Sequence, residues 1–177
     1  MGLGLGLLSL LAACGSEQDT GYYIGDSITR TDFEDAAGWG ADVSALTRER
    51  AHSGRYAIFV NAGREYSLTY RLPLREASVH QLKAIDIEAW VYLPSAKANA
   101  SLNVQVSPAG TNGGSTRYSE QLHLLDQVQE FGKWTKVQHT FVLPAGLSAE
   151  DELRIFLWRD ASAEPVFLDD LHAKARE

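Results

Sequence analysis

The sequence predicts an all-β protein folded as an antiparallel β-sandwich or barrel, and three observations lead to that fold class. Apolar and polar residues alternate with a period of two along most of the chain from residue 28 onward, as they do in strands with one buried face. Turn-forming Gly, Pro, Asn and Ser residues separate these runs. Only residues 122–131 have an apolar spacing that suits a helical turn. Many short strands with almost no helix are typical of sandwiches and barrels.

Nine segments have the pattern of strands. In residues 84–93, for example, the aliphatic side chains take one face, while Asp86, Glu88, Trp90 and Tyr92 share the other. The expected strands are residues 28–33, 55–60, 66–72, 84–93, 101–107, 117–122, 136–143, 153–158 and 166–173. Turn signals stand between them at residues 53–54, 61–63, 94–95, 108–110, 112–114 and 144–146.

Composition bounds the class of protein. The 177 residues include 16 Lys and Arg against 23 Asp and Glu, a net charge of -7. This balance argues against a nucleic-acid partner, since phosphate backbones are bound by basic patches. The single cysteine excludes an internal disulfide and a zinc site of several cysteines. The length suits one domain of about 150 residues.

The N-terminus has the pattern of a secretion signal. Residues 2–13 are uncharged and mostly apolar, too short for the roughly 20 residues that span a bilayer as a helix but typical of a signal-peptide core. Cys14 follows Leu11, Ala12 and Ala13, a run that resembles the bacterial lipoprotein lipobox. The resemblance implies cleavage before Cys14 and its lipidation; the alternative is a free or buried thiol without a function. No basic residue precedes the apolar run, which departs from the usual signal.

These features predict three parts in the chain. Residues 1–13 are expected to be a lipoprotein signal peptide, residues 14–27 a lipidated cysteine with a polar tether, and residues 28–177 the folded domain. A lipid-anchored protein would lie in the cell envelope, at the bacterial outer membrane or cell surface. The membrane is then a partner through the anchor.

Motifs of the common enzyme classes are missing from the sequence. There is no Gly-x-Ser-x-Gly, His-Glu-x-x-His, Walker or dinucleotide-binding glycine pattern. The five histidines lie far apart without ligand spacing. Adjacent carboxylates, as at Asp169 and Asp170, point to opposite faces of a regular strand and so make no acid/base pair. We therefore expect no enzyme; a hydrolase or lyase would need converging groups, for example Asp86 and Glu88 with Arg154.

Aromatic residues share strand faces with amides and charges. Sugar rings present apolar C–H faces for stacking, and their hydroxyl groups pair with planar polar side chains. A solvent-facing sheet of this composition therefore predicts a glycan groove, although aromatic side chains in sandwiches also serve as core or sheet cover. The candidate ligand residues are Trp90, Tyr92, Asn103, Gln105, Tyr118, Arg154, Phe156 and Trp158.

Four sequence features occur in a familiar order. They are residues 31–34 with Trp39 just after, residues 51–58, residues 132–144 containing Gly132, Trp134 and Pro144, and residues 166–171. Together they resemble the jelly-roll carbohydrate-binding modules of the galactose-binding-like superfamily, which are appended to cellulases and xylanases. The resemblance covers residues 28–174 and implies a jelly-roll β-sandwich that binds polysaccharide or oligosaccharide without catalysis.

The same resemblance implies a structural calcium ion where the first and last strands meet. It places Glu34 and Asp169 as carboxylate ligands, with backbone carbonyls near Asp32 and Arg55 completing an oxygen shell. The alternative is that both are ordinary edge carboxylates or pair with Arg residues. Whether Asp169 or Asp170 faces the metal stays open.

The expected function is that of a non-catalytic, glycan-binding lipoprotein at the cell surface. The alternative is a structural or protein-interaction lipoprotein on the same scaffold, with a surface protein as its partner and no sugar ligand. Because a fold does not determine a function, the choice depends on the site.

Overall fold

The computed structural model describes residues 26–40, 42–111 and 114–177 and is an antiparallel β-sandwich, which confirms the predicted all-β class. The strands are β1 (Ser27–Thr31), β2 (Leu46–Thr47), β3 (Ala57–Val60), β4 (Tyr66–Pro73), β5 (Ala84–Tyr92), β6 (Ser101–Ser107), β7 (Tyr118–His123), β8 (Trp134–Val142), β9 (Glu152–Trp158) and β10 (Val166–Arg176). The helices are α1 (Leu74–Ala77) and two short 3-10 helices, η1 (Val43–Ala45) and η2 (Leu124–Asp126). No helix among the described residues is long and apolar enough to cross a membrane.

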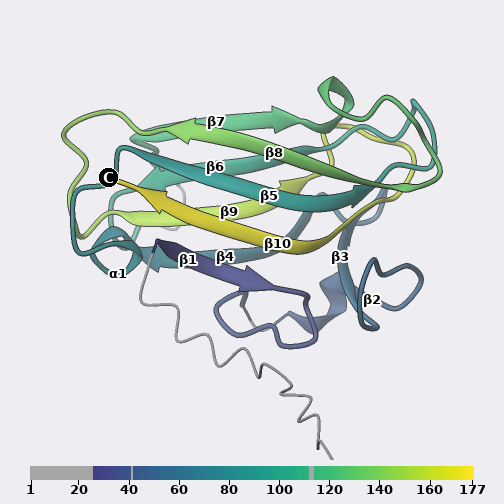
Figure 1. The fold of residues 1–177 in the computed structure, drawn as a ribbon, viewed down its shortest axis with the longest axis horizontal. Coiled ribbons are helices and arrows are strands. Elements are labelled where there is room, and N and C mark those ends of the chain that lie inside the picture. The colour runs from purple at the N-terminus through teal and green to yellow at the C-terminus, as the bar shows by residue number, and fades with distance from the viewer. Residues whose placement is uncertain (1–25, 41, 112–113) are drawn as a thin grey trace, which may run out of the picture.

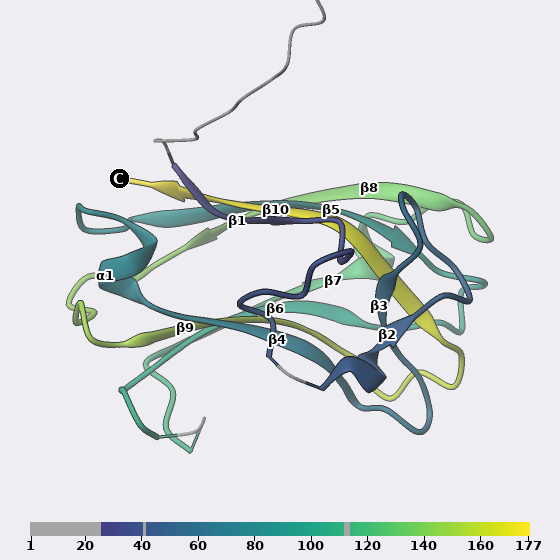
Figure 2. The same cartoon turned by 90° about the horizontal axis from the view of Figure 1, so that it is seen from below.

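The strands form two layers (Figure 1, Figure 2). The first sheet has the order β2-β3-β10-β5-β8, with β1 also beside β10, and the second has the order β4-β9-β6-β7. From β5 onward the chain passes between layers: β6 and β7 lie in the second sheet, β8 in the first, β9 in the second and β10 in the first. Strands that are neighbours in space are therefore often distant in sequence.

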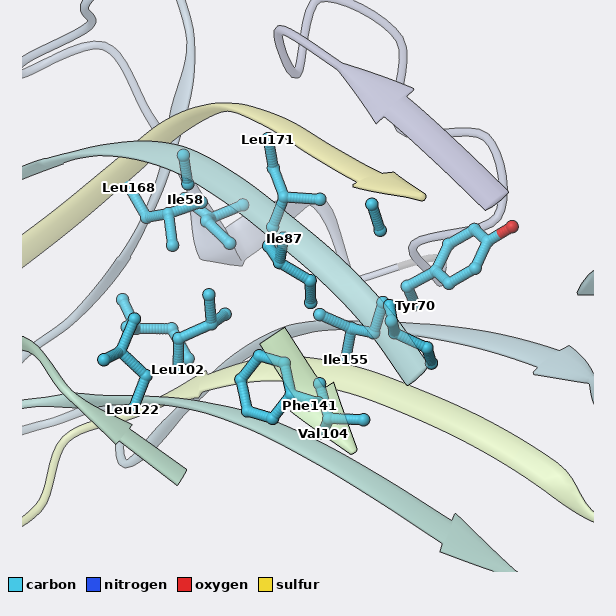
Figure 3. Close-up of a cluster of buried hydrophobic side chains, with 14 of the residues drawn as sticks. Ile58, Tyr70, Ile87, Leu102, Val104, Leu122, Phe141, Ile155, Leu168 and Leu171 are labelled. Carbon is cyan, nitrogen blue, oxygen red and sulfur yellow. The ribbon is translucent and has the colours of Figure 1, made fainter. Parts of the chain in front are cut away.

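The core lies between the two sheets, where the aliphatic residues of each period-two run meet. Figure 3 shows Ile87 and Leu168 from the first sheet lying opposite Leu102, Val104 and Ile155 from the second. All five are almost completely buried. Burial of such side chains contributes about 1.5–3 kcal/mol each, which explains why alternation predicted these strands well.

Local geometry differs from the expected pattern in a few places. The apolar run at residues 122–131 forms only the three-residue η2, and α1, η1 and β2 are too short to produce a periodic signal. The last strand is longer than expected and contains a register shift between Asp169 and His172, with Asp170 at φ 47°. A bulge of this kind breaks the alternation.

The Asp169 bulge corrects one inference from the sequence. On a regular strand the side chains of Asp169 and Asp170 would point to opposite faces, but in the structure both contact one loop. Asp169 accepts hydrogen bonds from the backbone N–H groups of His52 and Ser53, and Asp170 pairs with the side chains of the same two residues.

Candidate functional site

The outer face of the second sheet gathers aromatic, amide and guanidinium side chains in rows set by strand register. In β9, Leu153, Ile155 and Leu157 point into the core, so the alternate residues point outward. Reading across β4, β9, β6 and β7, the rows are Tyr66, Trp158, Ser101 and His123; then Thr69, Phe156, Asn103 and Gln121; then Arg71, Arg154, Gln105 and Ser119. We call them the aromatic row, the amide row and the arginine row.

The aromatic row provides flat apolar surface at one end of this face. Tyr66 is 51% exposed, and Trp158 is partly exposed with its indole N–H donating to Glu65 at 3.2 Å. Phe156, from the next row, is buried and packs edge-on against Tyr66 at 5.8 Å between ring centroids. Phe156 therefore supports the Tyr66 ring, while Tyr66 and Trp158 remain available for stacking.

One side chain of the amide row is hydrogen-bonded to the backbone of the sheet and is not available to a ligand. Asn103 is buried, and its side-chain amide donates to the Ser101 carbonyl at 2.8 Å. Gln121 on the edge strand is exposed, and Gln105 in the arginine row is partly exposed, with a long contact of 3.4 Å from Nε2 to Ser119 Oγ. Gln105 and Gln121 thus offer free amide groups, whereas Asn103 holds the backbone beside them.

The arginine row has two guanidinium groups on one carboxylate. Arg154 donates from Nε to Glu152 Oε1 at 2.6 Å, and Arg71 donates from Nη1 to the same oxygen at 3.5 Å. The Arg154 side chain is only 7% exposed, whereas that of Arg71 is 49% exposed. This end of the face is cationic and able to bind an anion.

A Ser–His–Asp cluster at the end of the aromatic row does not form a catalytic triad. Ser101 Oγ lies 2.9 Å from His123 Nδ1, and Asp160 Oδ2 lies 3.3 Å from the same nitrogen. A serine nucleophile requires its hydroxyl at one ring nitrogen and the carboxylate at the other. Ser101 is also fully buried, so the cluster holds the turn after β9 in place.

Trp90 and Tyr92 lie on the opposite side of the molecule from this face. They belong to β5 and point outward from the first sheet, where Trp90 pairs with Lys136 and Tyr92 with Trp134. The loop of residues 50–56 covers them: His52 stacks on Trp90 with ring centroids 4.0 Å apart, and the Arg50 guanidinium lies 3.9 Å from the centre of the Tyr92 ring. The structure thus divides the predicted ligand residues other than Tyr118 between two faces.

The rest of that first-sheet face is a hollow of about 640 Å³ lined by alternating charges. Glu88 pairs with Lys136 at 2.9 Å and Asp86 with Arg176 at 3.6 Å. Lys174 and two histidines, His139 and His172, also line the hollow, so bases outnumber the two acids there, and the exposed ion pairs are those of an ordinary solvated face. The postulated convergence of Asp86 and Glu88 with Arg154 is wrong, because Arg154 lies on the other sheet.

Tyr118 lies on neither outer face. It packs against the core at the edge of the second sheet, and its hydroxyl donates to Glu120 Oε2 at 2.6 Å. The other oxygen of Glu120 is 2.7 Å from His139 Nε2 on β8, in the first sheet. Burial raises the pKa of Tyr118 above its usual range. Tyr118 thus belongs to a polar link between the two sheets.

Of the four residues expected around calcium, Arg55 lies in the loop of residues 50–56, and Glu34 and Asp169 bind the backbone of that loop. Glu34 Oε1 accepts from the backbone N–H groups of Arg55 at 2.6 Å and Tyr56 at 2.9 Å. Asp169, fully buried, accepts from those of His52 and Ser53 at 2.7 and 3.1 Å. Asp32 caps the turn that presents Glu34 by accepting from the Glu34 N–H at 3.2 Å.

This donor set suits calcium in chemical type, since carboxylate oxygens are its preferred ligands. Burial raises the pKa of Asp169 to about 6, while the Arg55 backbone N–H holds the pKa of Glu34 below its usual value. Both carboxylates, however, are used as acceptors for N–H groups. No group of three or more acidic, His or Cys side chains within the described ranges is arranged to hold a metal. Calcium binding therefore stays a prediction.

Cys14 and the expected signal peptide lie outside the described residues, as does most of the expected tether. The candidate site residues that sequence reasoning missed are Tyr66, Arg71, Gln121 and His123. Period-two alternation could have identified Arg71 and Gln121, since each points outward from a strand with a buried face.

Comparison with known proteins identifies the family. The family model described as a carbohydrate binding domain matches residues 25–162, so the chain belongs to that family. A search of curated proteins yields no match.

Among solved structures, the chain is similar to two xylan-binding domains of Paenibacillus barcinonensis Xyn10C. The CBM22-1 domain is 22% identical with a TM-score of 0.50, covering 85% of this chain and 95% of that one. The CBM22-2 domain is 15% identical with a TM-score of 0.55, covering 84% and 99%. The C-terminal family 22 carbohydrate binding module of Clostridium thermocellum Xyn10B is 10% identical with a TM-score of 0.56, covering 85% and 93%. These similarities establish the jelly-roll fold, as predicted.

Proposed function

We propose that this protein binds a polysaccharide without catalysis on the outer face of the second sheet. The observation that carries the proposal is the aromatic row, in which Tyr66 and Trp158 are adjacent in register and accessible. Aromatic rings stack on the apolar faces of sugar rings, and the neighbouring amides of Gln105 and Gln121 suit hydroxyl groups. The xylan-binding relatives make a β-linked plant-type polysaccharide the first class to test.

The opposite face provides a matched control for this proposal. Trp90 is also a partly exposed tryptophan on a strand, but it is covered by His52 and lies among charged side chains such as Glu88 and Lys136. Stacking an aromatic ring on a nucleic-acid base is worth about 1–3 kcal/mol, and we expect a similar gain on the face of a sugar ring. Removal of an essential ring should therefore weaken binding by about 5- to 150-fold. Replacing Trp158 or Trp90 therefore shows which of the two faces binds the glycan.

The test is affinity electrophoresis of the purified full-length chain through native gels containing xylan, mannan, pectin, starch or a cellulose derivative. Trp158→Ala and Tyr66→Ala should abolish retardation in the glycan that binds, while Trp90→Ala should leave it intact. Circular dichroism establishes that each variant is folded. If only Trp90→Ala loses binding, the groove lies on the first sheet. If no glycan retards the wild type, the protein-interaction alternative is favoured.

We also propose that the protein acts as a lipoprotein of the cell envelope. Support comes from the sequence alone, through the apolar residues 2–13 and the lipobox-like run that ends at Cys14. An anchor would place many copies on one surface, so that weak individual contacts combine into avidity for a polymer.

A further inference from the structure

The arginine row is not needed to bind a neutral glycan. Stacking and hydrogen bonds from uncharged groups are enough to bind a neutral sugar, and the aromatic row and the amides already supply both. Arg71 and Arg154 are adjacent across β4 and β9, and Arg154 is adjacent to Gln105 across β6. Two like charges placed side by side on one face are unfavourable without a negative partner.

Glu152 neutralises only one of the two guanidinium groups. Both arginines approach the same oxygen of Glu152, and the contact from Arg71 is the longer one, at 3.5 Å. The neighbouring acids are used elsewhere: Asp151 pairs with Arg117 at 3.0 Å, and Glu150 pairs with Arg75. One positive charge of the arginine row is therefore left without a counter-charge.

Arg154 has donors to spare although it is more than nine-tenths buried. Among the residues that the structure describes, its guanidinium makes one hydrogen bond, from Nε to Glu152. A guanidinium has five N–H donors in a planar fork that matches a carboxylate. Its remaining N–H groups, together with the half-exposed Arg71, form a preorganised receptor for a second carboxylate.

The receptor lies at a useful distance from the aromatic row. Trp158 and Arg154 are four residues apart on β9, which at 3.3–3.4 Å per residue is about 13 Å. That distance corresponds to a few linked sugar rings. A single oligosaccharide can therefore stack on Trp158 and Tyr66 and also place an acidic group at Arg154 and Arg71.

We propose that the glycan bound by this protein is acidic and contains uronic acid residues, whose carboxylate joins Glu152 between Arg71 and Arg154. This inference rests on the proposed function, since it names the class of glycan for the same face. The net charge of the protein, -7, excludes general electrostatic attraction as the cause of any preference for an acidic glycan. An acidic polymer is repelled by the protein as a whole, so a preference for it requires a specific local contact.

The test compares acidic polysaccharides with carboxyl-reduced forms of themselves. The pairs are 4-O-methylglucuronoxylan, polygalacturonate and alginate, each with and without conversion of the carboxylate to a hydroxymethyl group, measured by calorimetry on the full-length chain. The wild type should bind one acidic form about tenfold more tightly than its reduced form, because hydrogen bonds to charged groups contribute on this scale. The preference should shrink as salt is raised.

Variants then locate the contact. Arg71→Gln should reduce the preference to less than threefold, because affinity for the acidic form falls far more than affinity for the reduced form. Arg71→Lys should restore the preference only in part, since lysine lacks the planar fork. Arg176→Gln, which removes an arginine from the outer face of the first sheet, is the matched control and should bind like the wild type. Arg71 is exposed, so its replacement preserves the fold.

The outcomes separate this inference from the proposed function. Equal binding of acidic and reduced forms, or binding of neutral glycans alone, overturns the acidic-glycan inference and leaves the proposed function standing. A preference that survives Arg71→Gln but is lost in Arg176→Gln also overturns it. Failure of the wild type to bind any member of any pair or any neutral glycan overturns both.

Discussion

Gly54 determines the shape of the loop of residues 50–56. Its φ of 56° lies in the left-handed region, and a Cβ atom built there would lie 2.6 Å from Glu34 Oε1. Glu34 does not move aside freely, because two backbone N–H groups hold that same oxygen. Glycine is therefore required both by the backbone angle and by the approach of Glu34.

We predict that Gly54→Ala lowers the free energy of unfolding by about 2–4 kcal/mol, since left-handed strain of about 1–2 kcal/mol adds to the loss of hydrogen bonds to a charged carboxylate. Gly146→Ala is the matched control, because Gly146 also has a positive φ, 85°, but has nothing within 4 Å of the added Cβ. The loss of unfolding free energy in Gly146→Ala should come from the backbone strain alone. Urea unfolding of both variants measures the difference, and equal losses would contradict a steric role for Glu34.

Single residues also show where sequence reasoning fails. Tyr66 falls on the same parity as Leu68 and Tyr70, which predicts a core position, yet it is half exposed. The register shift between Tyr66 and Thr69 explains the error, because an extra residue moves the side chains beyond it to the other face of the strand. The apolar parity of Tyr66, Leu68 and Tyr70 continues unbroken in the sequence, so this bulge cannot be read from it, and the exposed position of Tyr66 could only be found from the structure.

At the level of elements, alternation predicted which side of a strand is buried but not which sheet the strand joins. β5 and β9 both carry an outward tryptophan, so the sequence placed Trp90 and Trp158 in one groove. In the structure β5 lies between β10 and β8, and β9 lies between β4 and β6. These pairings join segments far apart in the chain, and no local pattern encodes them. The strands were thus predictable, whereas the division of the site between faces was not.

The junction of β1, β10 and the loop of residues 50–56 is the element on which the calcium prediction depends. If calcium binds through Glu34 and Asp169, it stabilises the native state by about 2.7 kcal/mol at a hundredfold excess over its Kd. We therefore expect calcium to raise the melting temperature by several degrees and EDTA to reverse the rise. Differential scanning calorimetry of the full-length chain measures both.

Glu34→Gln tests whether that response arises at this junction. The variant keeps the shape of the side chain and an oxygen acceptor for the Arg55 and Tyr56 N–H groups, but it removes the negative charge that calcium requires. Its melting temperature should not respond to calcium. Identical melting of the wild type with calcium and with EDTA, with no metal in the purified protein, would contradict the calcium site.

At the level of the whole molecule, β1 and the proposed glycan face belong to different sheets. β1 belongs to the first sheet beside β10, whereas β4, β9, β6 and β7 form the second sheet (Figure 2). The outer face of the second sheet carries the aromatic and arginine rows. A lipid anchor at Cys14 would thus join the protein through the layer opposite the proposed glycan face. Such an arrangement leaves that face free to meet a polymer outside the membrane.

We therefore predict that Cys14→Ser separates avidity from affinity. Cells expressing the wild type should be retained on surfaces coated with the bound polysaccharide, and Cys14→Ser should abolish this retention, fatty-acid labelling and membrane fractionation together. The purified variant should bind soluble oligosaccharide with unchanged affinity, because avidity requires many copies on one surface while the single site is intact. Ser16→Ala, two positions further on, is the matched control and should behave like the wild type. Membrane retention and labelling that persist in Cys14→Ser would show that the protein is held at the membrane by something other than this cysteine.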